Sequence, residues 1–219
     1  MKIIHGVLVT SFIILNLPAL AAEDWELRKE TDSIQVLTRD VQGSPYKAVK
    51  TTTVLRDIRL ASLVALIEDA EACPQWADKC AESYVFERIS ESESYTYTHN
   101  DMPFPVKDRD VLAHVRWEQD PDTLEVVMLS DAVEGKMDDV RGRLRLTEAK
   151  ASWRFRPLDD GAVEITNEAH INPGSSIPGW VTNMLLVDTP YQTMVSFVAE
   201  VRNPKYQNAS LDFVQEAAD

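Results

Sequence analysis

The sequence is poor in cysteine, in basic side chains and in long apolar runs. Its 219 residues include two cysteines, and 22 Lys and Arg residues stand against 36 Asp and Glu residues, so the formal net charge is −14. A surface this acidic repels phosphate backbones, and we therefore expect no nucleic-acid partner. The charge also disfavours electrostatic docking on anionic membranes, but it leaves transient contact through a local apolar patch open.

Signatures of catalysis and of metal binding are missing as well. The sequence contains no Gly-x-Ser-x-Gly segment, no phosphate-binding loop and no recognisable pair of catalytic carboxylates. Glu168 and His170 share one face of an expected strand, but a third metal ligand is lacking and an exposed polar face explains both. His99 and Asp101 end another strand, where turn hydrogen bonds account for them. We predict no enzymatic activity, no catalytic residue, no metal ion and no cofactor.

The longest apolar run lies at the N-terminus and is too short to span a membrane. Its 12 residues, "GVLVTSFIILNL", follow Lys2 and precede Pro18 and the small residues of "ALA". This order is typical of a cleaved signal peptide. We predict a signal peptide at residues 1–21 and a soluble protein that is exported to the periplasm or secreted.

The two cysteines, Cys73 and Cys80, lie seven residues apart in "CPQWADKC". In an oxidising compartment, a close pair of this kind favours a disulfide, with two free thiols as the alternative. The pair lacks Cys-x-x-Cys spacing and a neighbouring histidine, so thiol redox chemistry and metal binding are poorly supported.

The rest of the chain indicates one domain, residues 22–206, with a polar, acidic tail at 207–219 that we expect to be partly disordered. Helical periodicity covers residues 59–73, and residues 24–30 predict a short helix. Residues 80–172 alternate apolar and polar side chains almost throughout, as antiparallel strands with short turns do.

A second long helix is predicted between "NPGSSIPG" and Asn203, because apolar residues recur there at alternating steps of four and three. Pro190 lies in its middle and cannot donate a hydrogen bond to the Leu186 carbonyl, so we expect a kink. The predicted apolar stripe consists of Trp180, Met184, Val187, Tyr191, Met194, Val198 and Val201.

This long helix must bury its stripe, and a curved antiparallel sheet is the available partner. We therefore predict an α+β fold in which the sheet wraps around the C-terminal helix. Side chains either fill the cup of the sheet or leave an internal cavity, and the pattern leaves both open. The methionines and aromatic residues are compatible with either outcome, since they pack cores and also suit irregular apolar ligands.

Arg109 stands out because it precedes a strand whose inward face is otherwise apolar. Counting by two from Trp117 through Val115, Ala113 and Val111 places Arg109 on the same face. A buried guanidinium without an anion costs several kcal/mol, so Arg109 needs an acidic partner or a ligand head group. The alternative is an arginine at the strand edge, paired only with its acidic neighbours in sequence.

Three segments of the chain carry a resemblance to a known family: "ACPQWADKC", "PFPVKDRDVL" and "IPGWVTNMLLVDTPYQTMVSFV". In their order and spacing they resemble the START domain, the steroidogenic-acute-regulatory-related lipid-transfer module, in its exported bacterial form, from Trp25 to Tyr206. The resemblance implies a helix-grip fold: a U-shaped sheet that grips a long C-terminal helix around an apolar tunnel for one sterol, phospholipid or similar molecule. It also implies that Arg109 faces the tunnel and that residues 101–108 and 180–202 form its gate.

The resemblance often places an acidic residue beside this arginine, and we take Glu93, on the preceding strand, as the candidate. Together with the inward parity of the strands and the helical stripe, it yields a predicted ligand site. Its members are Arg109, Glu93, Tyr95, Tyr97, Val111, Ala113, Trp117, Met128, Trp153, Met184, Val187, Tyr191 and Met194.

The function expected from these observations is that of a monomeric carrier of one hydrophobic molecule. Two alternatives remain at this stage. Helix-grip proteins include cyclases that shape a reactive substrate in the same tunnel. A lipid-sensing protein would instead bind its ligand in order to change protein partners.

Overall fold

The computed structural model describes residues 24–175 and 177–216, so the predicted signal peptide lies outside the described residues. The sheet follows the order β1-β2-β3-β10-β9-β7-β6-β5-β4, and the short strand β8 pairs with β6. The strands are β1 (Glu26–Glu30), β2 (Ile34–Arg39), β3 (Ala48–Leu55), β4 (Cys80–Ser90), β5 (Glu93–Asn100), β6 (Arg109–Gln119), β7 (Val126–Ala132), β8 (Leu144–Arg145), β9 (Ala149–Pro157) and β10 (Val163–Ile171).

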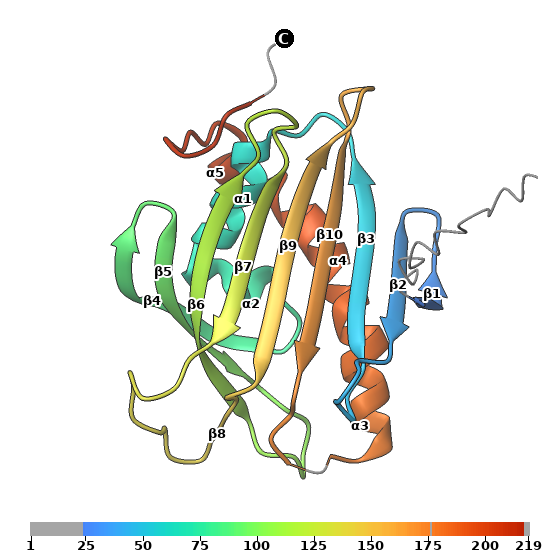
Figure 1. Ribbon diagram of the computed structural model, residues 1–219, viewed down its shortest axis with the longest axis vertical. Helices are drawn as coiled ribbons and strands as arrows, with labels where there is room; N and C mark the ends of the chain where they lie inside the picture. The colour runs from blue at the N-terminus through green and yellow to red at the C-terminus, as the bar shows by residue number, and fades with distance from the viewer. Residues whose placement is uncertain (1–23, 176, 217–219) are drawn as a thin grey trace, which may run out of the picture.

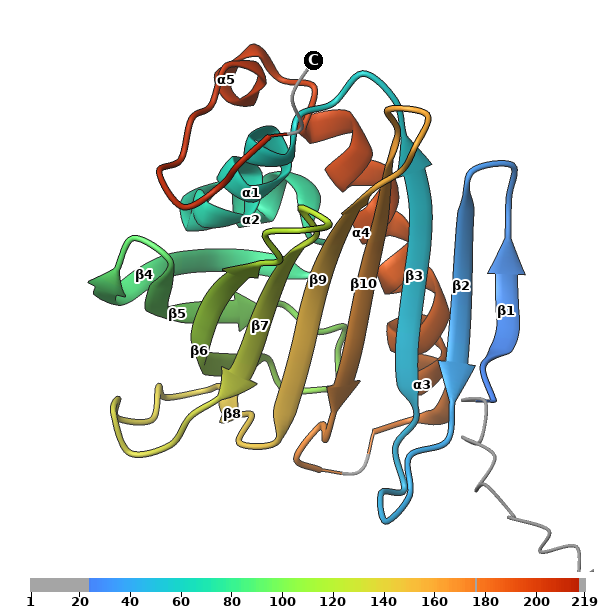
Figure 2. The same cartoon turned by 45° about the horizontal axis from the view of Figure 1, so that its top comes forward.

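The helices lie on one face of this sheet. The first group is α1 (Leu60–Glu68), the 3-10 turn η1 (Ala70–Ala72) and α2 (Cys73–Trp76); the second is α3 (Gly179–Asn183), the π turn η2 (Met184–Asp188), α4 (Thr189–Glu200) and α5 (Pro204–Gln207). Figures 1 and 2 show the strongly curved sheet with α3 and α4 running along its concave face. The predicted α+β helix-grip architecture is confirmed.

The short helix predicted for residues 24–30 is wrong, because this segment contains the edge strand β1. Within it, β1 pairs antiparallel with β2, so that Leu27 lies opposite Leu37. Seven residues are too few to form a stable helix alone, and the ladder of β2 supplies backbone partners that an isolated helical turn lacks.

Aromatic residues fill one end of the cup. Phe197 of α4 stacks on Trp153 of β9 with ring centroids 4.6 Å apart, and its edge-to-face contact with Trp76 has a centroid distance of 5.3 Å. Trp117 of β6 and Phe155 of β9 extend the cluster, with a centroid distance of 6.3 Å. Large rings bury the most apolar area per residue, so this end of the cup is packed core.

The long C-terminal helix is interrupted by the π turn η2 immediately before α4. Pro190 cannot bond to the Leu186 carbonyl, and Leu186 lies within this turn, so a π turn is found next to the position where we expected a kink. One additional residue in a turn rotates the following part of the helix by about 100° relative to the preceding part.

Residues 208–216 pack over α1, in place of the disorder expected for the tail. Phe213 lies against Trp117 with ring centroids 6.5 Å apart. The Glu216 carboxylate accepts hydrogen bonds from the backbone N–H of Leu60 at 3.0 Å and of Ala61 at 2.9 Å. It thereby caps α1, whose own N-cap residue, Arg59, provides no side-chain cap.

The predicted disulfide is present between Cys73 at the start of α2 and Cys80 at the start of β4. It closes the short loop that connects the helical layer to an edge of the sheet. Among residues 24–175 and 177–216, the structure contains no helix with the length and apolarity required to cross a membrane.

Candidate functional site

A cavity of about 530 Å³ occupies the part of the cup that the aromatic cluster leaves open. Its volume lies within the roughly 300–1,000 Å³ typical of sites for small molecules. The sheet contributes Val49 from β3 and Asn167, Ala169 and Ile171 from β10. The opposite wall belongs to the long helix, which contributes Thr182, Leu185, Leu186, Thr189, Pro190 and Thr193.

The strands explain why the cup is filled at one end and hollow at the other. Along the inward face of β10, Val163 and Ile165 belong to the core, and Asn167, Ala169 and Ile171 follow in the cavity. Along β6, the inward residues run from Trp117 at the filled end to Arg109 at the cavity. Smaller or polar side chains replace large apolar ones in this direction, so the helix cannot be packed against the sheet there.

Arg109 is buried in the cavity wall, with 4% of its surface exposed. Its Nη2 donates to Ser175 Oγ at 3.1 Å and to the Pro173 carbonyl at 3.4 Å, and its Nη1 donates to the Lys107 carbonyl. Its buried Nε has no hydrogen-bond partner among the residues that the structure describes. Burial lowers the pKa of Arg109, and Asp108 opposes that shift only in part.

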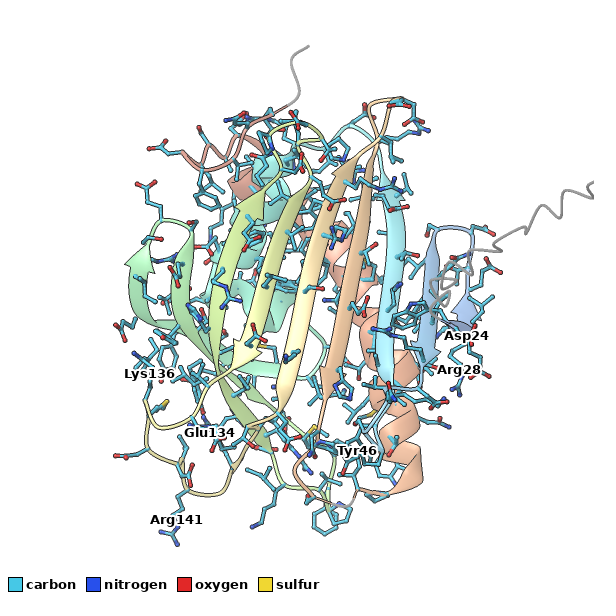
Figure 3. All side chains as sticks on the ribbon, viewed as in Figure 1. Asp24, Arg28, Tyr46, Glu134, Lys136 and Arg141 are labelled. Carbon is cyan, nitrogen blue, oxygen red and sulfur yellow. A yellow bond between two sulfur atoms is a disulfide. The ribbon has the colours of Figure 1, made fainter. Side chains whose placement is uncertain are left out.

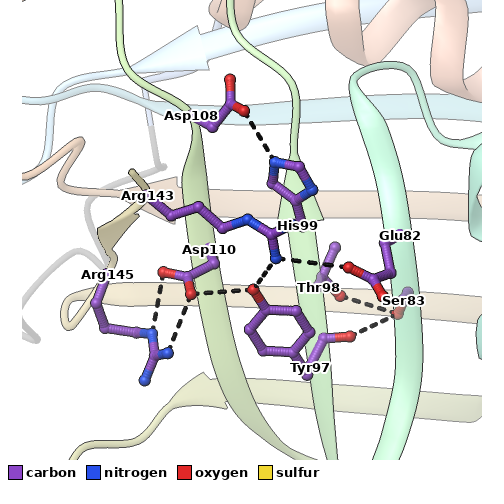
Figure 4. A network of polar contacts seen from close by, with 9 residues as sticks. All are labelled: Glu82, Ser83, Tyr97, Thr98, His99, Asp108, Asp110, Arg143 and Arg145. Carbon is purple, nitrogen blue, oxygen red and sulfur yellow. Dashed lines mark hydrogen bonds and ion pairs between the residues drawn. The ribbon is translucent and has the colours of Figure 1, made fainter. Parts of the chain in front are cut away.

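The acidic neighbours of Arg109 are occupied elsewhere. Asp110, which is 1% exposed, lies on the other face of β6, where Arg145 donates to it from Nε at 3.1 Å and from Nη2 at 3.0 Å. Asp108 accepts from the Met102 backbone N–H and lies 3.0 Å from His99 Nε2 (Figure 4). Within the described residues, no carboxylate forms an ion pair with Arg109, which argues against the strand-edge alternative.

The residues Glu93, Tyr95 and Tyr97 do not belong to the cavity, and the predicted pairing of Glu93 with Arg109 is wrong. In the register of β5 and β6, Asn100 lies opposite Arg109, so the even-numbered residues of β5 share its face. Odd-numbered residues of β5 point to the other face. There, Glu93 Oε1 lies 2.6 Å from His114 Nε2, and Tyr95 stacks on the same imidazole.

Tyr97 belongs to a buried polar network on this other face (Figure 4). Its hydroxyl donates to Asp110 Oδ2 at 3.0 Å and accepts a hydrogen bond from Arg143. Burial raises the pKa of the Tyr97 hydroxyl. Arg143 and Arg145 come from the segment between β7 and β9, so the network fastens that segment to β5 and β6.

Most of the remaining predicted ligand residues pack the core. Ala113, Trp117, Met128, Trp153 and Met194 are buried in the main hydrophobic cluster, and Val111 and Tyr191 pack partly buried against it. Met184 and Val187 are partly buried, but their face of the helix does not line the cavity. Among the residues that the structure describes, Arg109 is the one predicted site residue that lines the cavity.

The lining residues that sequence reasoning missed carry one recognisable signal, which is small size on an inward face. Ala169 and Asn167 have the inward parity of β10, as do the core residues Val163 and Ile165. A step from large to small or polar residues on one inward face indicates unfilled space facing the helix. The contribution of the helix could not be derived in this way, because its lining residues lie off the apolar stripe that the sequence shows.

Charged side chains around the cavity are mostly basic. The basic lining residues in the described chain are Arg28, Lys47, Lys79 and Arg109, and Asp78 is the acidic one. Asp78 is already engaged: Lys79 Nζ lies 3.2 Å from its carboxylate and Thr189 Oγ1 donates to it at 2.9 Å. The described residues contain no group of three side chains that could hold a metal ion.

Two large apolar side chains are exposed next to the lining residues. Phe104, 93% exposed, projects from the loop that connects Met102 and Arg109, both of which line the cavity. Trp180, 53% exposed, is the second residue of α3 and lies two residues before the lining residue Thr182. Both segments therefore belong to the rim of the same cavity, at the end of the molecule where α3 begins (Figure 1).

Comparison with known proteins places this geometry in context. The model of the START domain family matches residues 13–206. A protein of Pseudomonas aeruginosa that carries no functional name is 34% identical over 173 residues, which are 79% of this chain and 84% of that protein. The phosphatidylcholine transfer protein of Bos taurus is 28% identical over 173 residues, 77% of this chain and 80% of that protein.

A solved structure agrees with the sequence relatives. The STAR-related lipid transfer protein of Xanthomonas axonopodis superposes with a TM-score of 0.73 at 31% identity, and the alignment covers 82% of this chain and 99% of that one. Three findings point to the same family. They are the cavity between a curved sheet and a C-terminal helix, the match over most of the sequence, and this structural likeness. The chain belongs to the START domain family.

Proposed function

We propose that this protein binds one hydrophobic molecule, a lipid or a molecule of similar size, in the cavity and carries it as a monomer. The observation that carries the proposal is the cavity of about 530 Å³ between β3, β10 and the long helix, with mostly apolar or small walls. Burial of apolar surface at roughly 0.8 kcal/mol per methylene supports tight but reversible binding of one chain. Two relatives support the same class of ligand by their names. They are the phosphatidylcholine transfer protein of Bos taurus and the STAR-related lipid transfer protein of Xanthomonas axonopodis.

Arg109 is the polar end of this proposed site. Its guanidinium is buried, lines the cavity and has an unpaired Nε, so a ligand oxygen can complete its hydrogen bonds. The remaining donors are held by carbonyl and hydroxyl oxygens, which fix the direction of the side chain and leave its charge without a paired carboxylate.

The proposal includes transient contact with a membrane through the rim of the cavity. Phe104 and Trp180 are exposed apolar side chains on the two segments that flank the opening. Aromatic side chains partition well into the interface between water and lipid. Such contact needs no basic surface, in agreement with the net charge of −14.

The proposed place of action is the periplasm or the outside of the cell. The disulfide between Cys73 and Cys80 supports an oxidising compartment. There the protein would carry its apolar ligand between membranes and leave that ligand chemically unchanged.

Replacing Val49 by tryptophan tests the proposed site. Val49 lines the cavity from β3, so the larger ring occupies the ligand volume and should weaken binding of a fluorescent fatty acid about tenfold or more. The matched control is Val54→Trp on the same strand, where the side chain is exposed. Equal binding by both variants, each with a normal unfolding transition, would contradict a ligand site in this cavity.

A further inference from the structure

The charge of the cavity lining is opposite to the charge of the molecule. The whole chain has 22 basic and 36 acidic residues. The described lining contains four basic side chains, Arg28, Lys47, Lys79 and Arg109, and the carboxylate of Asp78. Lys79 pairs with Asp78, which also accepts a hydrogen bond from Thr189, so Arg28, Lys47 and Arg109 remain as cations without a carboxylate partner in the lining. The cavity is a region of positive potential inside an acidic protein.

Arg109 makes this charge energetically significant, because it is the buried member of the group. An uncompensated buried ion costs several kcal/mol; the groups that accept hydrogen bonds from Arg109 are neutral oxygens, and the charge of Asp108 offsets that of Arg109 only in part. The other three cations lie nearer to solvent, and Lys47 pairs with Asp40 at the surface. Lys79 pairs with Asp78, so the excess positive charge of the lining is carried mainly by Arg28 and Arg109.

The lining is also unsuited to a cationic head group. Quaternary ammonium groups are recognised by cages of aromatic rings or by carboxylates. Tyr46 is the aromatic side chain in the described lining, and Figure 3 shows it on the side of the molecule that carries Arg28, close to β3. A choline head group would therefore meet further positive charge, and the hydroxyl of a sterol would leave Arg109 without an anion.

We infer that the ligand of this cavity is an acidic amphiphile, whose head carries a carboxylate or a phosphate and no ammonium group. This inference rests on the proposed function, since it names the chemical class of the molecule that the same cavity binds. The carboxylate or phosphate lies at Arg109 and the apolar chain lies between β10 and the long helix.

Binding of four defined lipids to delipidated protein tests the inference. The probes are oleate, dioleoyl phosphatidic acid, dioleoyl phosphatidylcholine and cholesterol. We expect at least one of the two acidic lipids to bind ten times or more tightly than both of the others. The comparison of oleate with phosphatidic acid identifies the head as a carboxylate or a phosphate. Equal or tighter binding of phosphatidylcholine or cholesterol overturns the inference but leaves the proposed function standing, whereas binding of none overturns both.

Variants of lysine residues separate the effect of the charge in the cavity lining from the effect of charge elsewhere on the surface. The double variant Lys47→Gln, Lys79→Gln should weaken binding of the preferred acidic lipid about three- to tenfold at low ionic strength, and the difference should shrink as salt is added. Lys150→Gln is the matched control, because Lys150 is 80% exposed and lies outside this cavity. Cholesterol binding should not change in either variant. An unchanged affinity for the acidic lipid in the double variant, or an equal loss in the control, contradicts a role for the lining charge.

Discussion

Arg109 and Asp110 are neighbours in the chain with opposite surroundings. Arg109 faces the cavity without a paired carboxylate, and Asp110 is held on the other face by Arg145 and Tyr97. Both are almost fully buried, so each depends on its own partners to offset desolvation. The ion pair of Asp110 secures the start of β6, and this fixes the point at which Arg109 enters the cavity wall.

Asp108 is expected to stabilise the protein in a pH-dependent way. Its hydrogen bond from the Met102 backbone and its contact with His99 lower the pKa of Asp108 below the ordinary value. A carboxyl group whose pKa is lowered by folding contributes stability above its unfolded pKa of about 3.9, and loses it as the pH falls through the lower, folded value. Asp108→Asn should therefore lower the free energy of unfolding at pH 7, and its difference from the original protein should shrink as the pH falls below about 4.

Urea unfolding of both proteins between pH 3 and pH 7 measures this difference. Asp122→Asn serves as the control, because Asp122 is an exposed residue of the turn between β6 and β7. A difference that stays constant over the whole range would show that the negative charge of Asp108 is not responsible.

The orientation of Arg109 could be predicted from the sequence, whereas its surroundings could not. Alternation along one strand places Arg109 with Val111 and Trp117 without knowledge of any other strand. The assignment of Glu93 required the register between β5 and β6, and a register shift of one residue moves a side chain to the opposite face. Two of the three oxygens that hold Arg109 come from residues 173 and 175, far along the sequence, and the third is the carbonyl of Lys107.

At the scale of elements, the loop of residues 101–108 and the start of α3 form the proposed membrane contact. Phe104→Ser together with Trp180→Ser removes the two most exposed aromatic side chains at the rim. We expect this variant to sediment with lipid vesicles at least three times less than the original protein, because aromatic burial at the interface is lost. Its affinity for a lipid in solution should stay the same, since neither side chain lines the cavity.

Phe86→Ser is the matched control for vesicle binding. Phe86 is an exposed residue of β4, an edge strand remote from the cavity lining. If the control loses as much vesicle binding as the rim variant, the rim is not the contact surface.

The C-terminal segment is expected to stabilise α1 through Glu216. Glu216→Ala removes the acceptor for the backbone N–H groups of Leu60 and Ala61, and should lower the free energy of unfolding by about 1 kcal/mol. Asp212→Ala, an exposed change in the same segment, should have little effect. Chemical denaturation of both variants measures the difference, and equal stability would show that the cap contributes nothing.

Helices and strands could be predicted where apolar residues recur regularly over many positions. They were harder to predict where a contact between distant parts of the sequence determines the structure. The long helix was expected from its apolar stripe, but the helix residues that line the cavity, among them Leu185 and Leu186, lie off that stripe. The tail was expected to be partly disordered because it is polar and acidic. Its few apolar residues, Leu211, Phe213 and Val214, pack on the core, and a polar composition does not reveal such a contact.

At the scale of the whole molecule, the proposed export makes a direct prediction. The protein purified from its native cells should begin at Ala22, as expected for cleavage after residue 21, and contain no free thiol, since Cys73 and Cys80 are joined. Intact mass and N-terminal sequencing of the periplasmic or culture fraction provide the measurement. An uncleaved chain confined to the cytoplasmic fraction would contradict export.

The architecture itself was largely predictable, because a long amphipathic helix and a run of alternating strands leave few ways to bury their apolar faces. The sequence could not predict whether the cup is filled or hollow. That depends on how Trp76, Trp153 and Phe197 pack together at one end. Such a three-dimensional packing arrangement cannot be derived from parity within single strands.

The central claim is that the cavity holds one hydrophobic molecule, and native mass spectrometry of the gently purified protein tests it most directly. We predict a species heavier than the bare chain by the mass of one lipid, which tandem measurement identifies as acidic. This species should be strongly reduced in the Val49→Trp variant and retained in Val54→Trp. A spectrum that contains only the bare chain, even after incubation with oleate or phosphatidic acid, would contradict the claim.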